Sequence, residues 1–294
     1  MRYSNPEIPE GINVTQVHPL KEFFTLIAGV AGLVIVAVFL LAVTVQYLVT
    51  LIPFEKESQW LGRMGESFTA SMQSEEISDN HQQIEGYLQQ LADSLSEHQA
   101  LPEGMTITVH YSEGDTVNAF ATLGGNIVIF KGLLETLPHE NALAMVMAHE
   151  IAHIKHRHPI VALGRGVAVG LVLVSLSGVG DGVAVQQLLG NLSMLTTLTF
   201  SRSQEELSDH DALGVLSAEY GHIGGAEALF EVLQKEYDGK EPPQILSTHP
   251  HTEKRIERIK EMQTAMDTDT EFKPLPDFIL ELKKANKKDS PDNT

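Results

Sequence analysis

The two histidines of His149-Glu150-Ile151-Ala152-His153 are spaced to bind one metal ion. Residues four apart share one face of an α-helix, so both imidazoles can reach the same ion. Glu150 lies between them, where its carboxylate can reach a water molecule bound to that ion. The pentapeptide therefore predicts a zinc hydrolase.

A helix is expected to carry these residues. Residues 140–148 are strong helix formers without Gly or Pro, and the pattern continues through the pentapeptide to His158. Pro159 is expected to end this helix, because proline cannot donate a backbone hydrogen bond and its ring clashes with the preceding turn. The chemistry and the local sequence thus agree on a helical site.

Two histidines are too few for a catalytic zinc, which usually takes three protein ligands and a water molecule. Glu205 is the best third candidate, and its close competitor is Glu206. We favour Glu205 because it alone has an acid, Asp209, four residues later on the same helix face. One of this pair can bind zinc while the other accepts the second ring N–H of His149 or His153 and fixes its tautomer.

Four blocks of sequence, in order, carry a family resemblance. They are Asn118-Ala119-Phe120-Ala121 with Gly124-Gly125-Asn126-Ile127, the pentapeptide with Arg157-His158, Ser201-Arg202 with Glu205 and Asp209, and Thr248-His249-Pro250 with Arg255. In these blocks the chain resembles the membrane-associated gluzincin zinc metallopeptidases, the family of the HtpX heat-shock protease and the CAAX prenyl endopeptidases. One departure is Ser208, where relatives commonly have Ala.

The resemblance implies one zinc ion per chain, held by His149, His153 and Glu205, with Glu150 as general base. It also implies that the segment Asn118, Ala119, Phe120 and Ala121 is an edge strand that holds an extended peptide. A plain structural strand is the alternative for this segment. The expected reaction is cleavage of a peptide bond by activated water, without a covalent intermediate.

The roles of His249 and Arg255 stay open at this stage. Both can stabilise the transition state as electrostatic catalytic groups. Alternatively, His249 caps the turn before Pro250 or is a fourth zinc ligand, and Arg255 pairs with an acid. His156 and His158 point around the helix from the first two histidines, so we expect them to be surface or packing residues.

Composition limits the class of protein. The chain has 294 residues and is 43% hydrophobic, which suits one sizeable folded domain with a membrane segment. Its net charge of −19 argues against nucleic-acid binding, which needs a basic surface. Cysteine is absent, which excludes disulfides and a thiol nucleophile but identifies no compartment.

Residues 23–52 contain no charged side chain and exceed the roughly 20 residues that cross a bilayer. We expect a transmembrane anchor after a leader at 1–22; the apolar core of a cleaved signal peptide would be shorter. The nearest basic residues are Arg2 and Lys21 before the stretch and Lys56 and Arg63 after it. They balance under the positive-inside rule. The short leader and the following acids favour an inside N-terminus, which in a bacterial inner membrane makes the catalytic domain periplasmic.

The expected fold is α+β: a mainly helical zincin peptidase domain at 53–270 with a small β-sheet. An amphipathic helix is indicated by apolar residues at helical spacing, namely Ile77, Ile84, Leu88, Leu91 and Leu95. Strand patterns cover 105–110, 117–122 and 126–130.

An apolar, Gly-rich insertion at 166–180 is short for a membrane span. Buried core, a segment at the membrane or cleft, and a second span compete here. We disfavour the span because it would separate Glu205 from His149. Residues 271–294 are expected to form a flexible tail.

The sequence thus predicts a membrane-anchored zinc endopeptidase that cleaves damaged, unfolded or misassembled proteins at the membrane. Its expected partners are unfolded or membrane-associated protein substrates and the lipid bilayer. A CAAX-type enzyme is a weaker prediction, because those relatives have several membrane spans. A latent or non-proteolytic chaperone or adaptor with a closed zinc site is the alternative from another class. Hydrolysis of a non-peptide bond is disfavoured by the resemblance alone.

Overall fold

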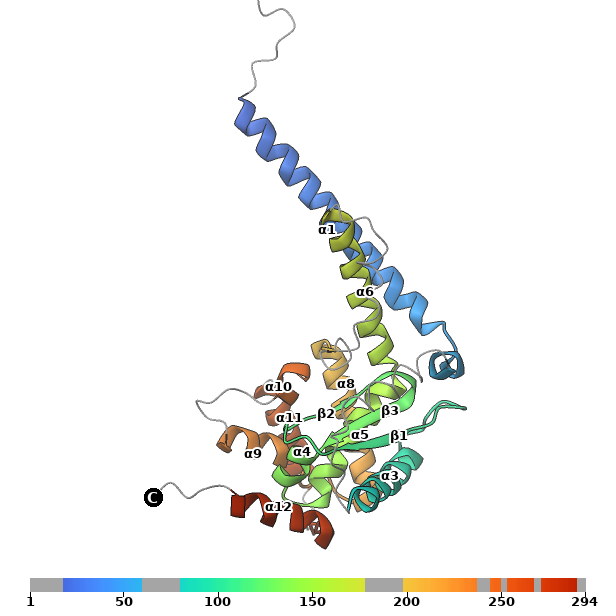
Figure 1. Ribbon diagram of the computed structural model, residues 1–294, viewed down its shortest axis with the longest axis vertical. Helices are drawn as coiled ribbons and strands as arrows, with labels where there is room; N and C mark the ends of the chain where they lie inside the picture. The colour runs from blue at the N-terminus through green and yellow to red at the C-terminus, as the bar shows by residue number, and fades with distance from the viewer. Residues whose placement is uncertain are drawn as a thin grey trace, which may run out of the picture.

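The structure, a computed structural model, describes residues 18–59, 80–177, 198–236, 244–249, 253–266 and 271–289. The expected fold class is confirmed: the molecule is mainly helical with one small sheet (Figure 1). The larger helices are α1 (Pro19–Thr50), α3 (His81–His98), α5 (Glu140–Lys155), α6 (His158–Ser177), α8 (Arg202–Tyr220), α11 (Glu253–Met266) and α12 (Asp277–Asp289). Shorter helices are α4 (Lys131–Thr136), α9 (Ala228–Glu236) and α10 (Gln244–Thr248).

The sheet has three strands in the order β1-β3-β2. β1 (Thr108–Ser112) runs parallel to β3 (Asn126–Phe130), and β2 (Ala119–Ala121) runs antiparallel to it. All three expected strands are present, with β1 beginning at Thr108 rather than at 105. β2 is therefore an edge strand of this sheet, beside the single central strand β3.

Helix α5 is the centre of the core. Every residue from Glu140 to Ile154 is buried, and the helix packs against α3, α8 and β2. Its first turn is capped by the His139 ring, which accepts a hydrogen bond from the Ala142 N–H at 3.1 Å. α3 turns its apolar stripe, including Ile84 and Leu88, into the same core, as its spacing predicts. Ile77 lies outside the described residues.

The end of α5 differs from the expected one. The helix stops at Lys155, and Arg157 adopts a left-handed backbone with φ of 59°. Pro159 does not end a helix; it lies in the first turn of α6, where its missing N–H leaves no intrahelical bond unmade. One residue with left-handed backbone, Arg157, thus separates two helices in the region where the sequence predicted a single helix up to His158.

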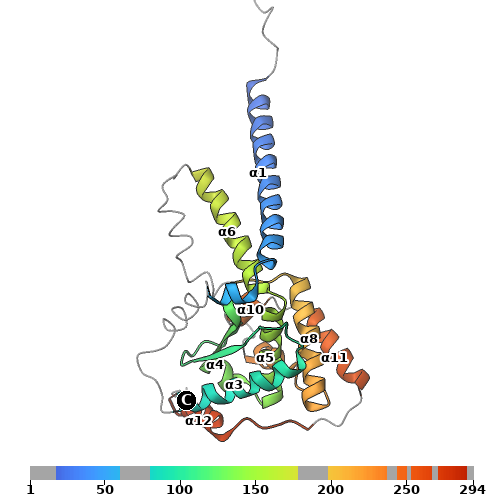
Figure 2. The ribbon, with the colours of Figure 1, turned by 90° about the vertical axis from the view of Figure 1, so that its right-hand side faces the viewer.

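Helices α1 and α6 project together from the body (Figure 1). Each helix has one end at the body, which we call its foot: the C-terminal end of α1 and the N-terminal end of α6. The two helices are closest at the foot of α1 and diverge away from the body (Figure 2). α1 is long and apolar enough to cross a membrane. The apolar insertion is helical over its described residues, 166–177, as part of α6. Residues 178–180 of that insertion lie outside the described part of the chain.

The segment after residue 270 differs from the flexible tail that we expected. Leu275 and Ile279 are buried in the main core, and α12 packs against α4. The backbone of Lys273 makes two hydrogen bonds to the start of α5, accepting from the Glu140 N–H and donating to the Asn141 side chain. The polar sequence of this segment predicted a flexible tail. Its packing depends on apolar contacts with distant parts of the chain, which the local sequence does not show.

Candidate metal centre

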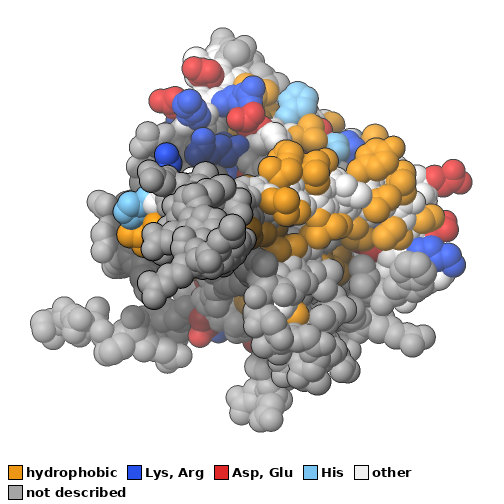
Figure 3. All heavy atoms as spheres, turned by 90° about the horizontal axis from the view of Figure 1, so that it is seen from above, with side chains coloured by type: hydrophobic (Ala, Val, Ile, Leu, Met, Phe, Trp, Pro, Cys, Tyr) orange, Lys and Arg blue, Asp and Glu red, His pale blue; other side chains and the backbone are white. Residues whose placement is uncertain are grey.

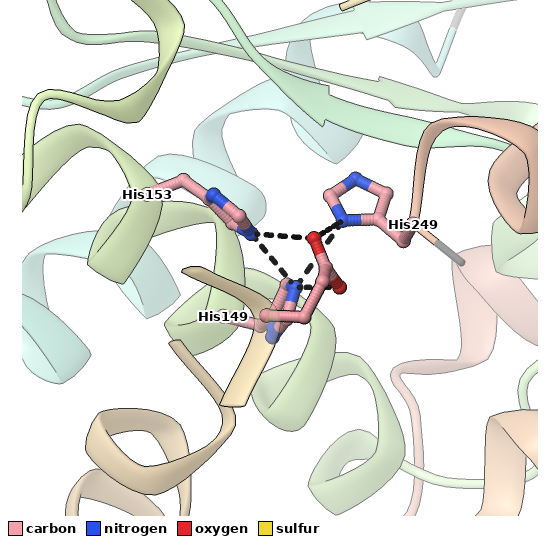
Figure 4. Close-up of side chains that lie close together, drawn as sticks. His149, His153 and His249 are labelled. Atoms are coloured by element: carbon pink, nitrogen blue, oxygen red, sulfur yellow. Dashed lines mark hydrogen bonds and ion pairs between the residues drawn. The ribbon is translucent and has the colours of Figure 1, made fainter. Parts of the chain in front are cut away.

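Four side chains meet in the interior of the body. His149, His153, Glu205 and His249 are all buried, and each offers one ligand atom within 4.8 Å of the others (Figure 4). Nε2 of His153 lies 3.0 Å from Nε2 of His149, which lies 3.3 Å from Nδ1 of His249. Oε1 of Glu205 lies 3.2 Å from Nδ1 of His249. These four groups come from α5, α8 and the residue that follows α10.

The elements explain why these residues converge. His149 and His153 share one face of α5. α8 begins with a capping box between Ser201 and Gln204, which fixes Glu205 in its first turn. Glu205 is 1% exposed, whereas the side chain of Glu206 is 60% exposed. The structure therefore brings Glu205, and not Glu206, to the two histidines.

Asp209 lies one turn after Glu205 and orients the first histidine. Its Oδ1 is 3.0 Å from Nδ1 of His149, and its carboxylate also accepts bonds of 2.6 and 2.7 Å from Arg255. Nη1 of Arg255 lies 2.8 Å from Oε2 of Glu205. Because Nδ1–H of His149 donates to Asp209, the lone pair of Nε2 faces the centre. The Arg255 guanidinium thus pairs with both Glu205 and Asp209.

The donor set fits zinc. Nε2 of His149 faces the second imidazole nitrogen, from His153, and the Glu205 carboxylate at 3.4 Å. Lone pairs that converge in a buried site need a cation to balance them. Two imidazole nitrogens and one carboxylate oxygen form a ligand set found in catalytic zinc sites.

The electrostatics of the site also favour a cation. Burial alone would raise the pKa of Glu205, but hydrogen bonds with His149 and His153 hold this pKa well below its usual value. Burial alone would lower the pKa of His149, but Asp209 and Glu205 outweigh it and raise this pKa to about 10. The two carboxylates thus draw positive charge to this ring, and a metal ion bound at Nε2 would take the place of the second proton. Burial alone would also raise the pKa of Asp209, but hydrogen bonds with His149 and Arg255 lower it. The carboxylates of Glu205 and Asp209 are therefore ionised and attract positive charge.

Glu150 joins the centre to the edge strand. Its Oε2 accepts a hydrogen bond of 2.7 Å from the Ala121 N–H, and its Oε1 lies 3.4 Å from Nε2 of His249. Burial raises the pKa of Glu150 above its usual value. A carboxylate with a raised pKa, fixed by one oxygen, can take up a proton with the other.

The expected substrate strand lies beside the centre. The Asn118 carbonyl accepts from the Phe130 N–H, and the Thr122 N–H donates to Asn126, so even-numbered residues bond to β3. Backbone groups alternate in direction along a strand. Those of Ala119 and Ala121 therefore point away from β3, and the Ala121 N–H already reaches Glu150. Ala119, Phe120 and Ala121 are all buried, and α10 lies close to β2.

Two residues near the centre escaped sequence reasoning. Nδ1 of His158 lies 2.9 Å from Nδ1 of His153, and the ring of Phe200 stacks on His153 with centroids 4.0 Å apart. His158 is buried, so the expected packing role holds, but its contact with a ligand was missed. The helix break at Arg157 carries His158 back to His153. His156, as expected, lies away from the centre and pairs with Asp211 at 2.9 Å.

An apolar pocket opens beside the candidate metal centre. Its polar wall consists of His149, Glu150, Asp209, His249 and Arg255. Its remaining lining is apolar and comes from α5, α9, α10 and a residue two positions before α9: Met145, Val146, Ala226, Leu229, Phe230, Leu233, Ile245 and Leu246. An apolar side chain adjacent to the reacting bond would find its complement here.

Comparisons with known proteins match this part of the chain. The model of the family described as Peptidase family M48 matches residues 81–263. The chain is 31% identical over 158 residues to the beta-barrel assembly-enhancing protease of Escherichia coli K12, covering 48% of this chain and 31% of the relative. It is 31% identical over 156 residues to the mitochondrial metalloendopeptidase OMA1 of Schizosaccharomyces pombe, covering 52% and 45%. The chain thus spans between about a third and a half of these relatives.

Proposed function

Because the chain belongs to peptidase family M48, we propose that it is a membrane-anchored zinc-dependent endopeptidase. The observation that carries this proposal is the buried cluster of His149, His153 and Glu205 beside a glutamate that is hydrogen-bonded to an edge strand. The apolar helix α1 supplies the anchor. We propose the anchor at 23–52 and the peptidase domain at 53–270.

His149, His153 and Glu205 would hold the zinc, and Asp209 and Arg255 would keep these ligands in place. Bound zinc supplies a Lewis acid that activates water and the scissile carbonyl. Oε2 of Glu150 is fixed by the Ala121 N–H, which leaves Oε1 to accept the proton of the attacking water and return it to the leaving amine.

The substrate is proposed to bind as an added strand along β2. The backbone of Ala119 points away from β3 on the same side as Glu150, so it can bond to an extended peptide and present that peptide to the base. The adjacent apolar pocket would take a side chain next to the scissile bond. Sequence-independent backbone bonding suits damaged, unfolded or misassembled proteins, because their chains are free to extend.

The compartment is a finer proposal. We place the N-terminus inside and the peptidase domain on the periplasmic side of a bacterial inner membrane. One relative is named for enhancing β-barrel assembly. That name supports a protein substrate near a membrane.

The proposal is tested by zinc content and casein cleavage in detergent, comparing wild type, Glu150→Gln and Glu206→Gln. Glu206 is exposed and lies outside the centre, so its variant is the matched control. Cleavage by wild type and Glu206→Gln, with none by a Glu150→Gln protein that retains about one zinc per chain, would support the assignment. Equal activity of Glu150→Gln would rule out this general base. If all three proteins bind zinc but cleave no unfolded substrate, the adaptor hypothesis gains.

A second candidate function, a latent protease, is favoured by the position of His249. Its Nδ1 lies with the three proposed ligands, and a fourth protein ligand would close the position that water needs. The preceding helix α10 lies close to β2, where a substrate would bind. Activity that rises in His249→Ala would support latency. Activity that disappears while zinc is retained would instead support transition-state stabilisation by this ring.

A further inference from the structure

Helix α6 follows the proposed zinc helix directly and is nearly free of charge. Arg165 is its only Lys, Arg, Asp or Glu residue. The guanidinium of Arg165 lies 3.3 Å from Oε1 of Gln204, at the first turn of α8. The rest of the described helix, residues 166–177, is composed of Gly, Ala, Val, Leu and Ser. Any environment for this part must therefore accept an apolar surface.

One face of α1 is covered and the rest is exposed. The half-buried positions of α1 between residues 31 and 50 follow helical spacing: Val34, Val38, Ala42, Val45 and Val49. α6 packs against α1, and Figures 1 and 2 both show it beside the foot of that helix. A stripe at intervals of three and four residues is the pattern of a helix–helix contact.

Gly164 sets the closeness of this contact. A Cβ atom at Gly164 would lie 2.7 Å from Cγ1 of Val45 and 3.2 Å from Cγ1 of Val49. Small residues at such positions let helix backbones approach each other, as in membrane helix pairs. One turn later, Ala168 is 2% exposed. The two helices therefore form a defined pair at their feet.

Apolar surface remains uncovered around this pair. Val169 of α6 is 41% exposed, and large apolar side chains of α1 are exposed along the helix. An apolar crevice also opens between the two feet. Figure 3, which looks down on this end of the molecule, shows hydrophobic side chains gathered in one broad field. A contiguous apolar surface of this kind indicates a membrane or protein partner.

The feet of both helices rest on the sheet. Phe120, Val128, Phe130 and Ile160 form one buried cluster, against which Val49, Ile52 and Leu163 pack. This cluster lies on the side of the sheet opposite the main core, which contains Ala119 and Ala121. The edge strand β2 is thus a single side-chain layer from the foot of the membrane anchor.

We propose that α6 enters the lipid bilayer beside α1, with lipid acyl chains covering its exposed face and filling the crevice at its foot. The inference rests on the membrane anchor of the proposed function and places its metal centre just beneath the membrane surface. Residues 166–177 rise about 18 Å as a helix, less than the roughly 30 Å of hydrocarbon in a bilayer. This part of α6 therefore enters the membrane without crossing it, and His149 and Glu205 stay on one side.

The substrate class follows from this placement. A strand that binds at β2 would lie close to the membrane surface. Protein segments that emerge from or adhere to the bilayer would reach the centre without leaving the membrane. Membrane-associated substrates are expected from the sequence, and this placement adds that the cleaved part is an extended segment at the lipid surface.

Single-cysteine variants test the placement directly, because the natural chain has no cysteine. Val169→Cys in α6, Leu33→Cys in α1 and Leu207→Cys in α8 would each be spin-labelled in the full chain, in phosphatidylcholine vesicles. Leu207 is the matched control: it is 40% exposed against 41% for Val169, but it belongs to the body. The measurement is the collision rate of the label with oxygen, which enriches in lipid, and with a water-soluble nickel chelate.

We expect the labels at residues 169 and 33 to collide several-fold more with oxygen and several-fold less with nickel than the label at 207. A label at 169 that behaves like the one at 207 while 33 stays in lipid would overturn this inference and leave the anchor intact. A label at 169 shielded from both agents would also overturn it, because protein would then cover α6. If 33 also behaved like 207, the anchor of the proposed function would fail as well.

Discussion

Helices α5 and α6 are consecutive in the chain and both rich in apolar residues, yet their surroundings are opposite. α5 is buried from Glu140 to Ile154, and its charged side chains have partners in neighbouring elements. α6 has no charged residue after Arg165 and leaves Val169 exposed. The comparison shows that composition does not decide where an apolar helix lies. The paired polar residues determine the location, because each polar group inside the body needs a hydrogen-bond partner.

The junction between the two helices is itself tied to the anchor. The guanidinium of Arg157 donates to Glu57 at 2.6 and 3.0 Å and to the Ile52 carbonyl at 3.0 Å. Glu57 also accepts from the Gly124 N–H at 2.9 Å, in the turn between β2 and β3. The left-handed residue that ends α5 thus also joins the foot of α1 to the sheet. These contacts make α5, the edge strand β2 and α1 one connected unit.

Asp209→Ala should have the largest effect, because it breaks the polar pairing that keeps α5 inside. It removes the partner of His149 Nδ1 and leaves Arg255 buried with only part of its pairing. Breaking a buried ion pair costs about 3–5 kcal/mol, and loss of a ligand's partner weakens metal affinity roughly 10- to 100-fold. Unfolding in urea and zinc titration with a competing chelator would measure both.

Glu206→Ala, on the exposed face of the same helix, is the control and should change stability by less than about 0.5 kcal/mol. Equal effects of the two substitutions would mean that α5 does not depend on its paired polar groups. The contrast with α6 would then lose its physical basis.

Gly164→Leu should break the other half of the comparison, the close approach of α6 to α1. The new side chain would meet Val45 and Val49, and overpacking of this kind costs about 1–3 kcal/mol. We expect a lower unfolding temperature in detergent with zinc binding unchanged. Gly29→Leu is the matched control, because nothing lies within 4 Å of a Cβ at that position. An unchanged unfolding temperature of Gly164→Leu would show that the two helices do not pair in detergent.

His158→Ala probes the junction, where the first residue of α6 contacts a proposed ligand on α5. Burial lowers the pKa of His158 to about 4, so a neutral ring can accept the Nδ1–H of His153 and direct Nε2 of His153 to the centre. We expect zinc affinity to fall about tenfold. His156→Ala should leave affinity unchanged, since that ring pairs with Asp211. The same loss in both variants would assign the effect to the helix end rather than to the ring.

Local patterns were enough to anticipate one part of the molecule. The i, i+4 spacing predicted that His149 and His153 would lie together, and the Asp209 spacing selected Glu205 over Glu206. The three strands also followed from alternation and turn residues. In each case the signal lies within a few residues of the feature it predicts.

Features that depend on distant contacts were not predictable in this way. The break at Arg157 rests on contacts to Glu57 and Ile52, about a hundred residues earlier in the chain. The approach of His249 to the centre depends on where α10 packs. The docking of residues 271–283 depends on contacts with α4 and α5. No local spacing encodes these partners, so the sequence left the roles of His249 and His158 open or missed them.

Ser208→Ala should have the smallest effect on stability. It tests whether the buried polar groups around α5 are all paired. The hydroxyl of Ser208 is fully buried and makes no hydrogen bond within the described part of the chain. Alanine removes an unsatisfied group and is a better helix former, so we expect a gain of up to about 1 kcal/mol. Ser217→Ala, at a half-buried position of the same helix, isolates the gain from helix propensity. Urea unfolding that instead shows Ser208→Ala to be destabilised relative to Ser217→Ala would mean that this hydroxyl has a partner. Polar pairing around α5 would then extend beyond Glu205 and Asp209.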